Sequence, residues 1–121
     1  MQTVYEILGR QWFDDLVDRF YDSVENDPIL RPMYPEDLAE PRARLAGFLV
    51  QFWGGPTDYS DARGHPRLRM RHVPFPIGQG ERDAWFGHMS EALAGAHELP
   101  AVIREEMITY FDRAATAMMN R

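Results

Sequence analysis

Apolar residues recur along this chain at the three- and four-residue spacing that builds one face of an α-helix. The first run has acidic residues on its opposite side and predicts a helix that ends near Asn26, before Pro28. Its apolar members are Trp12, Phe13, Leu16, Val17, Phe20, Tyr21 and Val24. Three later runs have the same spacing: Leu45, Phe48, Leu49, Phe52 and Trp53; Trp85, Phe86, Met89, Leu93 and Ala96; and Ile103, Met107, Ile108, Phe111, Ala114, Ala115 and Met118.

Glycine and proline residues mark where these helices should begin and end. Gly54 and Gly55 stop the second helix, because glycine readily adopts the left-handed backbone of a helix C-terminus. Pro100 suits the first turn of the fourth helix, and residues 29–34 lie among three prolines, which allows a short helical turn at most. No segment alternates apolar and polar residues as a strand does, so the predicted fold class is all-α.

One stretch departs from this periodicity. Residues 54–80 form a long connection with little helical pattern, and a loop of this length inside a compact domain indicates function. Within it, segment 64–75 reads Gly-His-Pro-Arg-Leu-Arg-Met-Arg-His-Val-Pro-Phe and combines histidine, arginine and apolar residues.

Composition narrows the class of protein. The 121 residues, 45% of them hydrophobic, are enough for one core, so we expect a single domain over residues 1–121. A formal net charge of −6 argues against a nucleic-acid binder, which needs clustered cations. The absence of lysine excludes Schiff-base and P-loop lysine chemistry. The absence of cysteine excludes thiolate and iron–sulfur sites, so a metal would need His, carboxylate or Tyr ligands.

The sequence shows neither a signal-peptide pattern at its start nor an apolar run long enough to cross a membrane. We therefore expect a cytoplasmic protein without a membrane segment.

Of the four histidines, His72 is the best candidate ligand. His88 and His97 are interpreted as surface or hydrogen-bonded structural residues, and His65, between Gly64 and Pro66, as a residue that shapes its segment.

His72 is surrounded by two kinds of side chain. Apolar residues (Met70, Val73 and Phe75) and cations (Arg67, Arg69 and Arg71) flank it in one short element. A haem needs an axial nitrogen, apolar contacts for the porphyrin and cations for its propionates. A surface basic patch with an incidental histidine explains the same residues equally well, and the segment alone leaves both alternatives open.

Other chemistries have weaker support. There is no HExxH or His-x-His zinc pattern, no Gly-x-Ser-x-Gly elbow, and no basic recognition helix of a helix-turn-helix regulator.

Five motifs in order over nearly the whole chain make it resemble a truncated haemoglobin of the second group. They are Arg19-Phe20-Tyr21, Tyr34-Pro35-Glu36-Asp37-Leu38, Phe52-Trp53-Gly54-Gly55-Pro56, the segment 64–75, and Glu81-Arg82-Asp83-Ala84-Trp85. The resemblance implies a two-over-two helical sandwich around haem b, with a short helix ahead of His72.

For the proximal side, the resemblance implies that His72 is the iron ligand and that its other ring nitrogen donates to a backbone carbonyl or similar acceptor. Arg71, and after it Arg69, would meet the propionates. Phe75 would pack near the ring edge.

For the opposite, distal side, the resemblance implies that Tyr21, Tyr34 and Trp85 face the ligand. Phenol O–H and indole N–H groups can donate to a bound oxygen that carries partial negative charge, so three donors predict slow oxygen release. Taken singly, each could also be an ordinary core aromatic.

The second helix would place Leu45 toward the ligand and Phe48 one turn further along. The distal histidine of oxygen-carrying globins would fall at Pro41, which cannot donate a hydrogen bond. A second departure from the wider family is that only Gly9 remains of a glycine pair between the first two helices.

The expected function is reversible binding of oxygen or of related ligands such as NO, CO or peroxide, for storage, transport or oxygen and nitric-oxide oxidoreductase activity. A haem peroxidase is one alternative, and a cofactor-free all-α module that binds an acidic partner is another. A reductase of unknown identity would keep the iron ferrous, and the chain could form an oligomer.

Overall fold

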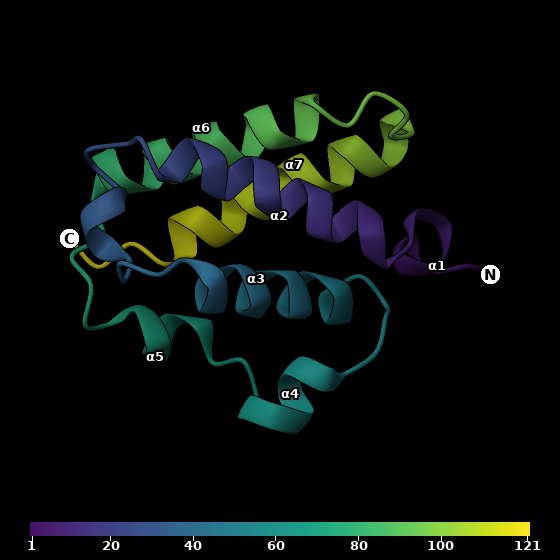
Figure 1. Cartoon of the computed structure of the whole chain (residues 1–121), viewed down its shortest axis with the longest axis horizontal. Coiled ribbons are helices and arrows are strands. Elements are labelled where there is room, and N and C mark those ends of the chain that lie inside the picture. The colour runs from purple at the N-terminus through teal and green to yellow at the C-terminus, as the bar shows by residue number, and fades with distance from the viewer.

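The computed structural model describes all 121 residues and contains only helices, as the sequence predicted. The helices are α1 (Val4–Leu8), α2 (Arg10–Val24), the 3₁₀ helix η1 (Arg31–Met33), α3 (Ala39–Phe52), α4 (Asp58–Arg63), α5 (Leu68–His72), α6 (Gln79–Ala94) and α7 (Ala101–Ala117). α2 packs against α3, and α6 packs against α7. The contact between α2 and α6 joins these two pairs of long helices (Figure 1). α4 and α5 hang below α3 in this view as a strap.

The core lies among the four helices that the periodicity predicted. α2 contributes six buried side chains to it: Phe13, Leu16, Val17, Phe20, Tyr21 and Val24. α6 and α7 face them with residues such as Met89, Leu93, Met107 and Phe111, each at most 1% exposed. Because each helix buries the stripe that repeats every three to four residues, the sequence pattern located these elements correctly.

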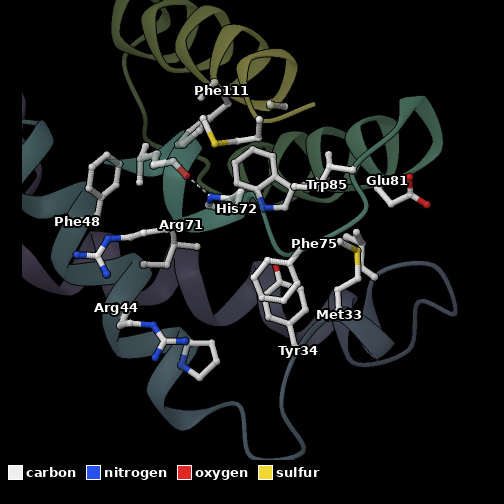
Figure 2. A pocket seen from close by; sticks show the side chains of 18 of the residues that line it. Met33, Tyr34, Arg44, Phe48, Arg71, His72, Phe75, Glu81, Trp85 and Phe111 are labelled. Carbon is white, nitrogen blue, oxygen red and sulfur yellow. Dashed lines mark hydrogen bonds between the residues drawn. The ribbon is translucent and has the colours of Figure 1, made fainter. Parts of the chain in front are cut away.

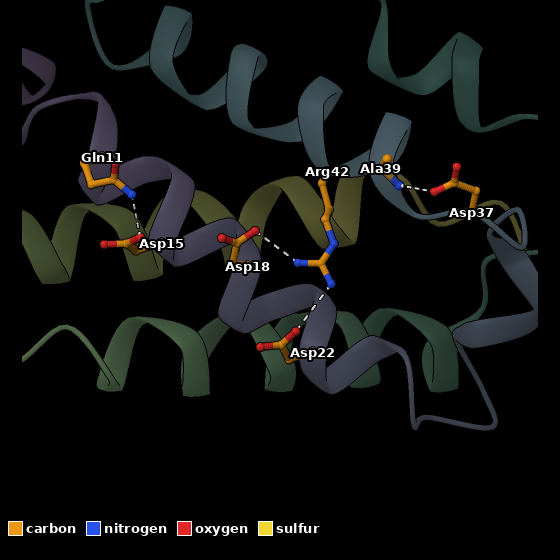
Figure 3. A network of polar contacts seen from close by, with 7 residues as sticks. All are labelled: Gln11, Asp15, Asp18, Asp22, Asp37, Ala39 and Arg42. Atoms are coloured by element: carbon orange, nitrogen blue, oxygen red, sulfur yellow. Dashed lines mark hydrogen bonds and ion pairs between the residues drawn. The ribbon is translucent and has the colours of Figure 1, made fainter.

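Arg42 ties α3 to α2 on the outer side of this pair (Figure 3). Its guanidinium donates to Asp18 at 3.0 Å and to Asp22 at 3.3 Å, two carboxylates one turn apart on α2. The same guanidinium lies 5.6 Å above the ring of Tyr21. The bridge therefore fixes α3 beside the part of α2 that carries Tyr21.

The second predicted helix begins earlier than its apolar run. α3 starts at Ala39, six residues before Leu45, and includes Pro41 in its first turn, where a missing N–H costs nothing. Asp37 accepts a hydrogen bond from the Ala39 N–H at this end.

The N-terminal segment forms an additional helix, α1, which the apolar pattern did not predict. Thr3 and Glu6 form a capping box at its start, and Gly9 separates it from α2 with a φ of 84°. The remaining glycine of the expected pair therefore makes this corner.

Gly54 and Gly55 end α3 and let α1 approach it. A Cβ on Gly54 would lie 2.5 Å from the Thr3 side chain, and one on Gly55 would lie 2.7 Å from Val50. The Tyr5 N–H bonds the Trp53 carbonyl at 2.9 Å across the same contact. This glycine pair is needed for close packing as well as for helix termination.

The irregular stretch 54–80 is more ordered than predicted. Besides α5, the short helix that the resemblance implied ahead of His72, it contains α4, which the sequence pattern missed. Neither helix has a fully buried residue. Among all the helices, none combines the length and the apolar character that a membrane span requires.

Candidate functional site

A cavity of about 530 Å³ lies between the helical sandwich and the strap formed by α4 and α5. Of the 25 residues that line it, 17 are hydrophobic, which is the character of a site for a large, mainly apolar ligand. Every helix except α1 contributes to the wall. Figure 2 shows His72, Tyr34 and Trp85, from different elements, turned toward this space.

His72 is the last residue of α5 and is half-buried in the cavity wall. Its Nδ1 lies 2.6 Å from the Leu68 carbonyl oxygen, one turn earlier (Figure 2). Because a carbonyl oxygen only accepts, Nδ1 carries the proton and Nε2 keeps a lone pair for a metal. A backbone carbonyl is the acceptor that we expected for this second ring nitrogen.

The structure separates the two arginines that were expected beside the propionates. Arg71 lines the cavity, where its Nε donates to the Pro66 carbonyl at 2.7 Å and its Nη2 to the Arg63 carbonyl at 3.0 Å. Arg69 does not line it. Leu68, Arg71 and His72 share one face of α5 by their spacing of three and four residues, whereas Arg69 lies on the other face, in a smaller pocket with Met70 and Val73. The structure therefore supports Arg71 over Arg69 as the cation nearest the cavity, and a propionate contact from Arg69 stays a prediction.

Three arginines that sequence reasoning missed also line the cavity: Arg44, Arg63 and Arg82. Arg44 pairs with Glu40 at 2.6 Å, and Arg82 pairs with Asp83 and Asp112. Arg63 forms no ion pair and lies 5.9 Å from the Tyr59 ring centre. Its guanidinium is thus available to an acidic ligand group.

Tyr21, Tyr34 and Trp85 come together on another part of the wall. The rings of Tyr21 and Tyr34 meet edge to face with centres 5.5 Å apart. Burial and the neighbouring Tyr34 raise the pKa of Tyr21 far above its usual value of 10.0. Burial raises the pKa of Tyr34 to about 12, against smaller opposing contributions from hydrogen bonding with Tyr21 and Trp85. Both phenols therefore keep their protons at neutral pH and can act as donors.

The predicted apolar positions also face the cavity. Pro41, Leu45, Phe48 and Phe75 are all part of its lining. Pro41 and Leu45 are one turn apart on α3, and both face the cavity. Pro41 occupies the position expected for the distal histidine of oxygen-carrying globins, and its side chain cannot donate a hydrogen bond. The ring centre of Phe75 lies 6.5 Å from that of His72.

The other three histidines lie outside this lining. His65 is exposed, and its Nδ1 accepts a hydrogen bond from the Arg67 N–H at 3.3 Å, which shapes the start of α5. His88 bonds Asp27, and His97 is exposed. All three agree with their structural interpretation.

Asn120 is a further residue that the sequence analysis missed. Its side chain accepts from the Ile77 N–H at 2.9 Å and donates to the carbonyls of Phe75 at 2.8 Å and His72 at 3.3 Å. It ties the chain that leaves α5 to the C-terminal end of α7. No local pattern marks a partner 48 residues away, so only the structure could find it.

These residues fit haem. No group of three or more His, Asp or Glu side chains could enclose a metal ion, so a metal at His72 would have to bring most of its ligands with it, as iron does in a porphyrin. The apolar lining suits the faces of a porphyrin, and Arg63 and Arg71 offer guanidinium groups to propionates. A helical sandwich with one available imidazole nitrogen on the wall of such a cavity is the arrangement of a globin.

Comparisons with known proteins agree. The family model described as bacterial-like globin matches residues 3–120. Group 2 truncated hemoglobin YjbI of Bacillus subtilis is 39% identical over 117 residues, which cover 97% of this chain and 88% of that protein. The solved hemoglobin of Chloroflexus aurantiacus is 52% identical over the whole of both chains, with a TM-score of 0.96. That of Thermobifida fusca is 50% identical over 98% of each chain, with a TM-score of 0.95.

The chain belongs to the bacterial-like globins and, within them, to the group II truncated haemoglobins. Its fold is the two-over-two globin fold, its cofactor is haem b, and its ligands are small diatomic molecules. The family decides between the alternatives left open for the basic segment, in favour of haem over a cofactor-free module.

Proposed function

We propose that this protein holds haem through His72 and retains oxygen with donors from Tyr21, Tyr34 and Trp85, and that it works as an oxygen or nitric-oxide oxidoreductase rather than as a bulk oxygen carrier. When bound, the haem supplies a ferrous iron that takes up diatomic ligands reversibly. A reductase of unknown identity would restore the ferrous state.

The role of His72 is supported by its protonation. The Leu68 carbonyl holds the proton on Nδ1 and fixes the plane of the ring, so Nε2 presents its lone pair to the cavity. We assign the propionates to Arg71 and Arg63, and packing against the haem to Phe48 and Phe75.

One observation carries the proposal for oxygen: two protonated tyrosines, Tyr21 buried and Tyr34 half-buried, and one indole line the same cavity. Donors that are already oriented stabilise developing negative charge without reorganising, and they do so more strongly where water is excluded. Leu45 and Pro41 add apolar surface and no competing donor. The solved Bacillus subtilis relative, 38% identical, is described as oxygen-avid, which supports the same property here.

The same residues favour oxygen retention over peroxidase chemistry. Cleavage of peroxide needs a group that moves a proton near the bound ligand. The tyrosines here have strongly raised pKa values, and the Glu81 carboxylate accepts from the Gly78 N–H at 2.8 Å. Peroxide reduction is therefore the second candidate and is measured alongside the first.

The donors are tested by stopped-flow oxygen dissociation from the ferrous protein. Tyr21→Phe and Trp85→Phe should each speed dissociation, because each removes a donor worth on the order of 1 to 3 kcal/mol. Tyr5→Phe, outside the cavity, is the control. Wild-type rates in both variants would mean that neither donor reaches the ligand.

The activity is tested with one preparation and one chemical reductant. Nitric-oxide consumption in the presence of oxygen, peroxide reduction and simple oxygen release are measured under the same conditions. We expect nitric-oxide consumption to be the fastest turnover. Turnover of peroxide alone would favour the peroxidase alternative.

A further inference from the structure

We propose that Asp27 and His88 form a positioning pair that holds Tyr34 beside Trp85 and thereby sets the donor geometry at the ligand. Neither residue lines the cavity. The inference rests on the proposed role of Tyr34 and Trp85 as donors, and it concerns how the fold keeps that arrangement.

Asp27 organises the chain that leaves α2. Its Oδ1 accepts from the Ile29 N–H at 2.6 Å and from the Leu30 N–H at 3.3 Å. Its carbonyl accepts from the Arg31 N–H at 2.9 Å. The turn that leads into η1 is therefore folded around this single residue.

Arg31 closes the other end of the same segment. Its guanidinium donates to three successive carbonyls, those of Tyr34 at 3.4 Å, Pro35 at 2.9 Å and Glu36 at 2.7 Å. The Tyr34 N–H in turn bonds the Arg31 carbonyl at 3.2 Å. Because both ends are bonded internally, residues 27–36 behave as one body, and a displacement of Asp27 carries Tyr34 with it.

His88 connects this body to α6. Its Nε2 bonds the second carboxylate oxygen of Asp27, and the two side chains are only 23% and 12% exposed. Such a shielded contact is less weakened by solvent and salt than a surface ion pair is. The contact with His88 also lowers the pKa of Asp27, so its carboxylate is ionised at neutral pH and accepts strongly.

The position of His88 on α6 links it to the ligand donors. It lies three residues after Trp85, about one turn along the same side of the helix. The segment 27–36 thus faces α6 at two neighbouring places: Tyr34 and Trp85 line the same cavity, and Asp27 bonds His88. The Asp27–His88 contact therefore fixes how Tyr34 approaches Trp85.

The pair is tested by oxygen dissociation from the ferrous protein. His88→Leu should speed dissociation roughly three- to tenfold, the range expected when a donor bond is weakened rather than lost. His88→Gln keeps a donor at this position and should stay within about twofold of wild type. His97→Leu is the matched control, because His97 is exposed and bonds neither segment.

A double-mutant cycle separates positioning from stability. If the pair acts through Tyr34, His88→Leu should change the rate less than about twofold in a Tyr34→Phe background. The same acceleration in both backgrounds would overturn the proposal. A lower melting temperature with unchanged oxygen dissociation would also overturn it.

A measurement without ligand turnover completes the test. Amide hydrogen exchange of the ferric holoprotein should be faster at Arg31, Met33 and Tyr34 in His88→Leu than in wild type. If these amides loosen but Tyr34→Phe alone leaves oxygen dissociation unchanged, the donor role under the proposed function is what fails. If Tyr34→Phe has its effect but neither exchange nor dissociation responds to His88→Leu, the positioning pair is what fails.

Discussion

The two walls of the cavity are stabilised by different interactions, one by burial of apolar side chains and the other mainly by hydrogen bonds. The wall that carries Tyr21 belongs to α2, whose apolar stripe is buried in the core. The wall that carries His72 is α5, a five-residue helix with no buried residue. Apolar side chains of α5 and of the chain that follows it face solvent, with Met70 57% and Val73 69% exposed.

On the side of the cavity that carries His72, a few hydrogen bonds hold α5 in place of buried apolar contacts. Arg71 bonds the carbonyls of Arg63 and Pro66, and Asn120 bonds the chain after His72 from the end of α7. The position of Tyr21 is therefore fixed by the folding of the core itself. The helix that carries His72 is held mainly by polar contacts, so substitutions in the two walls should have different consequences.

The largest expected effect tests the core side. Phe20→Ala should lower the free energy of unfolding by about 3 to 5 kcal/mol, since Phe20 is 0% exposed and its removal leaves a cavity. Val73→Ala, in the exposed chain directly after α5, should change it by less than about 0.5 kcal/mol. Urea unfolding of the holoprotein measures both. Equal losses would mean that the two walls do not differ as described.

The next effect tests the histidine side. His72→Ala should weaken haem binding on the order of 100-fold or more, because even the outer partners of a metal ligand contribute 10- to 100-fold. Hemin titration followed by the Soret band measures it. His65→Ala is the control and should bind haem normally. An unchanged spectrum in His72→Ala would move the ligand elsewhere, with His65 the first candidate.

The difference between the walls also explains what the sequence could predict. The four long helices could be predicted because their buried residues, such as Leu16, Phe20 and Met107, belong to apolar runs that repeat every three to four residues. α4 has no such apolar stripe. Gln51 of α3 holds it instead: its Nε2 donates to the Ser60 hydroxyl at 2.7 Å, and its Oε1 accepts from the Ser60 N–H at 2.9 Å. Contacts of this kind lie between elements and leave no local pattern.

Two local signals in the sequence mark features that the apolar pattern alone does not predict. Thr3 and Glu6 have the spacing of a capping box, which marks the start of α1. The four-residue spacing of Leu68 and His72 places them on one face of α5, and Arg69 falls off that face. Asn120 gave no comparable signal, because its partners lie more than 40 residues earlier.

A smaller effect should follow from removing the hydrogen bonds of Asn120 to the chain after α5. Asn120→Ala removes hydrogen bonds to Ile77 and Phe75, so haem loss to an excess of apomyoglobin should become roughly three- to tenfold faster. Oxygen dissociation should stay within about twofold of wild type, since the ligand donors lie on the other wall. A change in oxygen dissociation as large as that in haem loss would show that the two walls are coupled.

The smallest effect is confined to alkaline solution and tests the environment of the Tyr34 phenol. Burial raises the pKa of Tyr34 from 10.0 to about 12, so above pH 10 the unfolded chain releases a proton that the folded protein retains. The contribution of Tyr34 to stability is therefore constant below about pH 9 and falls as the pH rises through 10 toward 12. Tyr34→Phe lacks this loss, so the stability of wild type relative to the variant should decline between pH 9 and pH 11.5, roughly the window in which the phenol of an unfolded chain ionises. Urea unfolding at each pH measures the difference, with Tyr5→Phe as the control outside the cavity. A stability difference independent of pH would mean that the folded protein leaves the pKa of Tyr34 unchanged and that its phenol is accessible to water. The contrast between the two walls would then not include Tyr34.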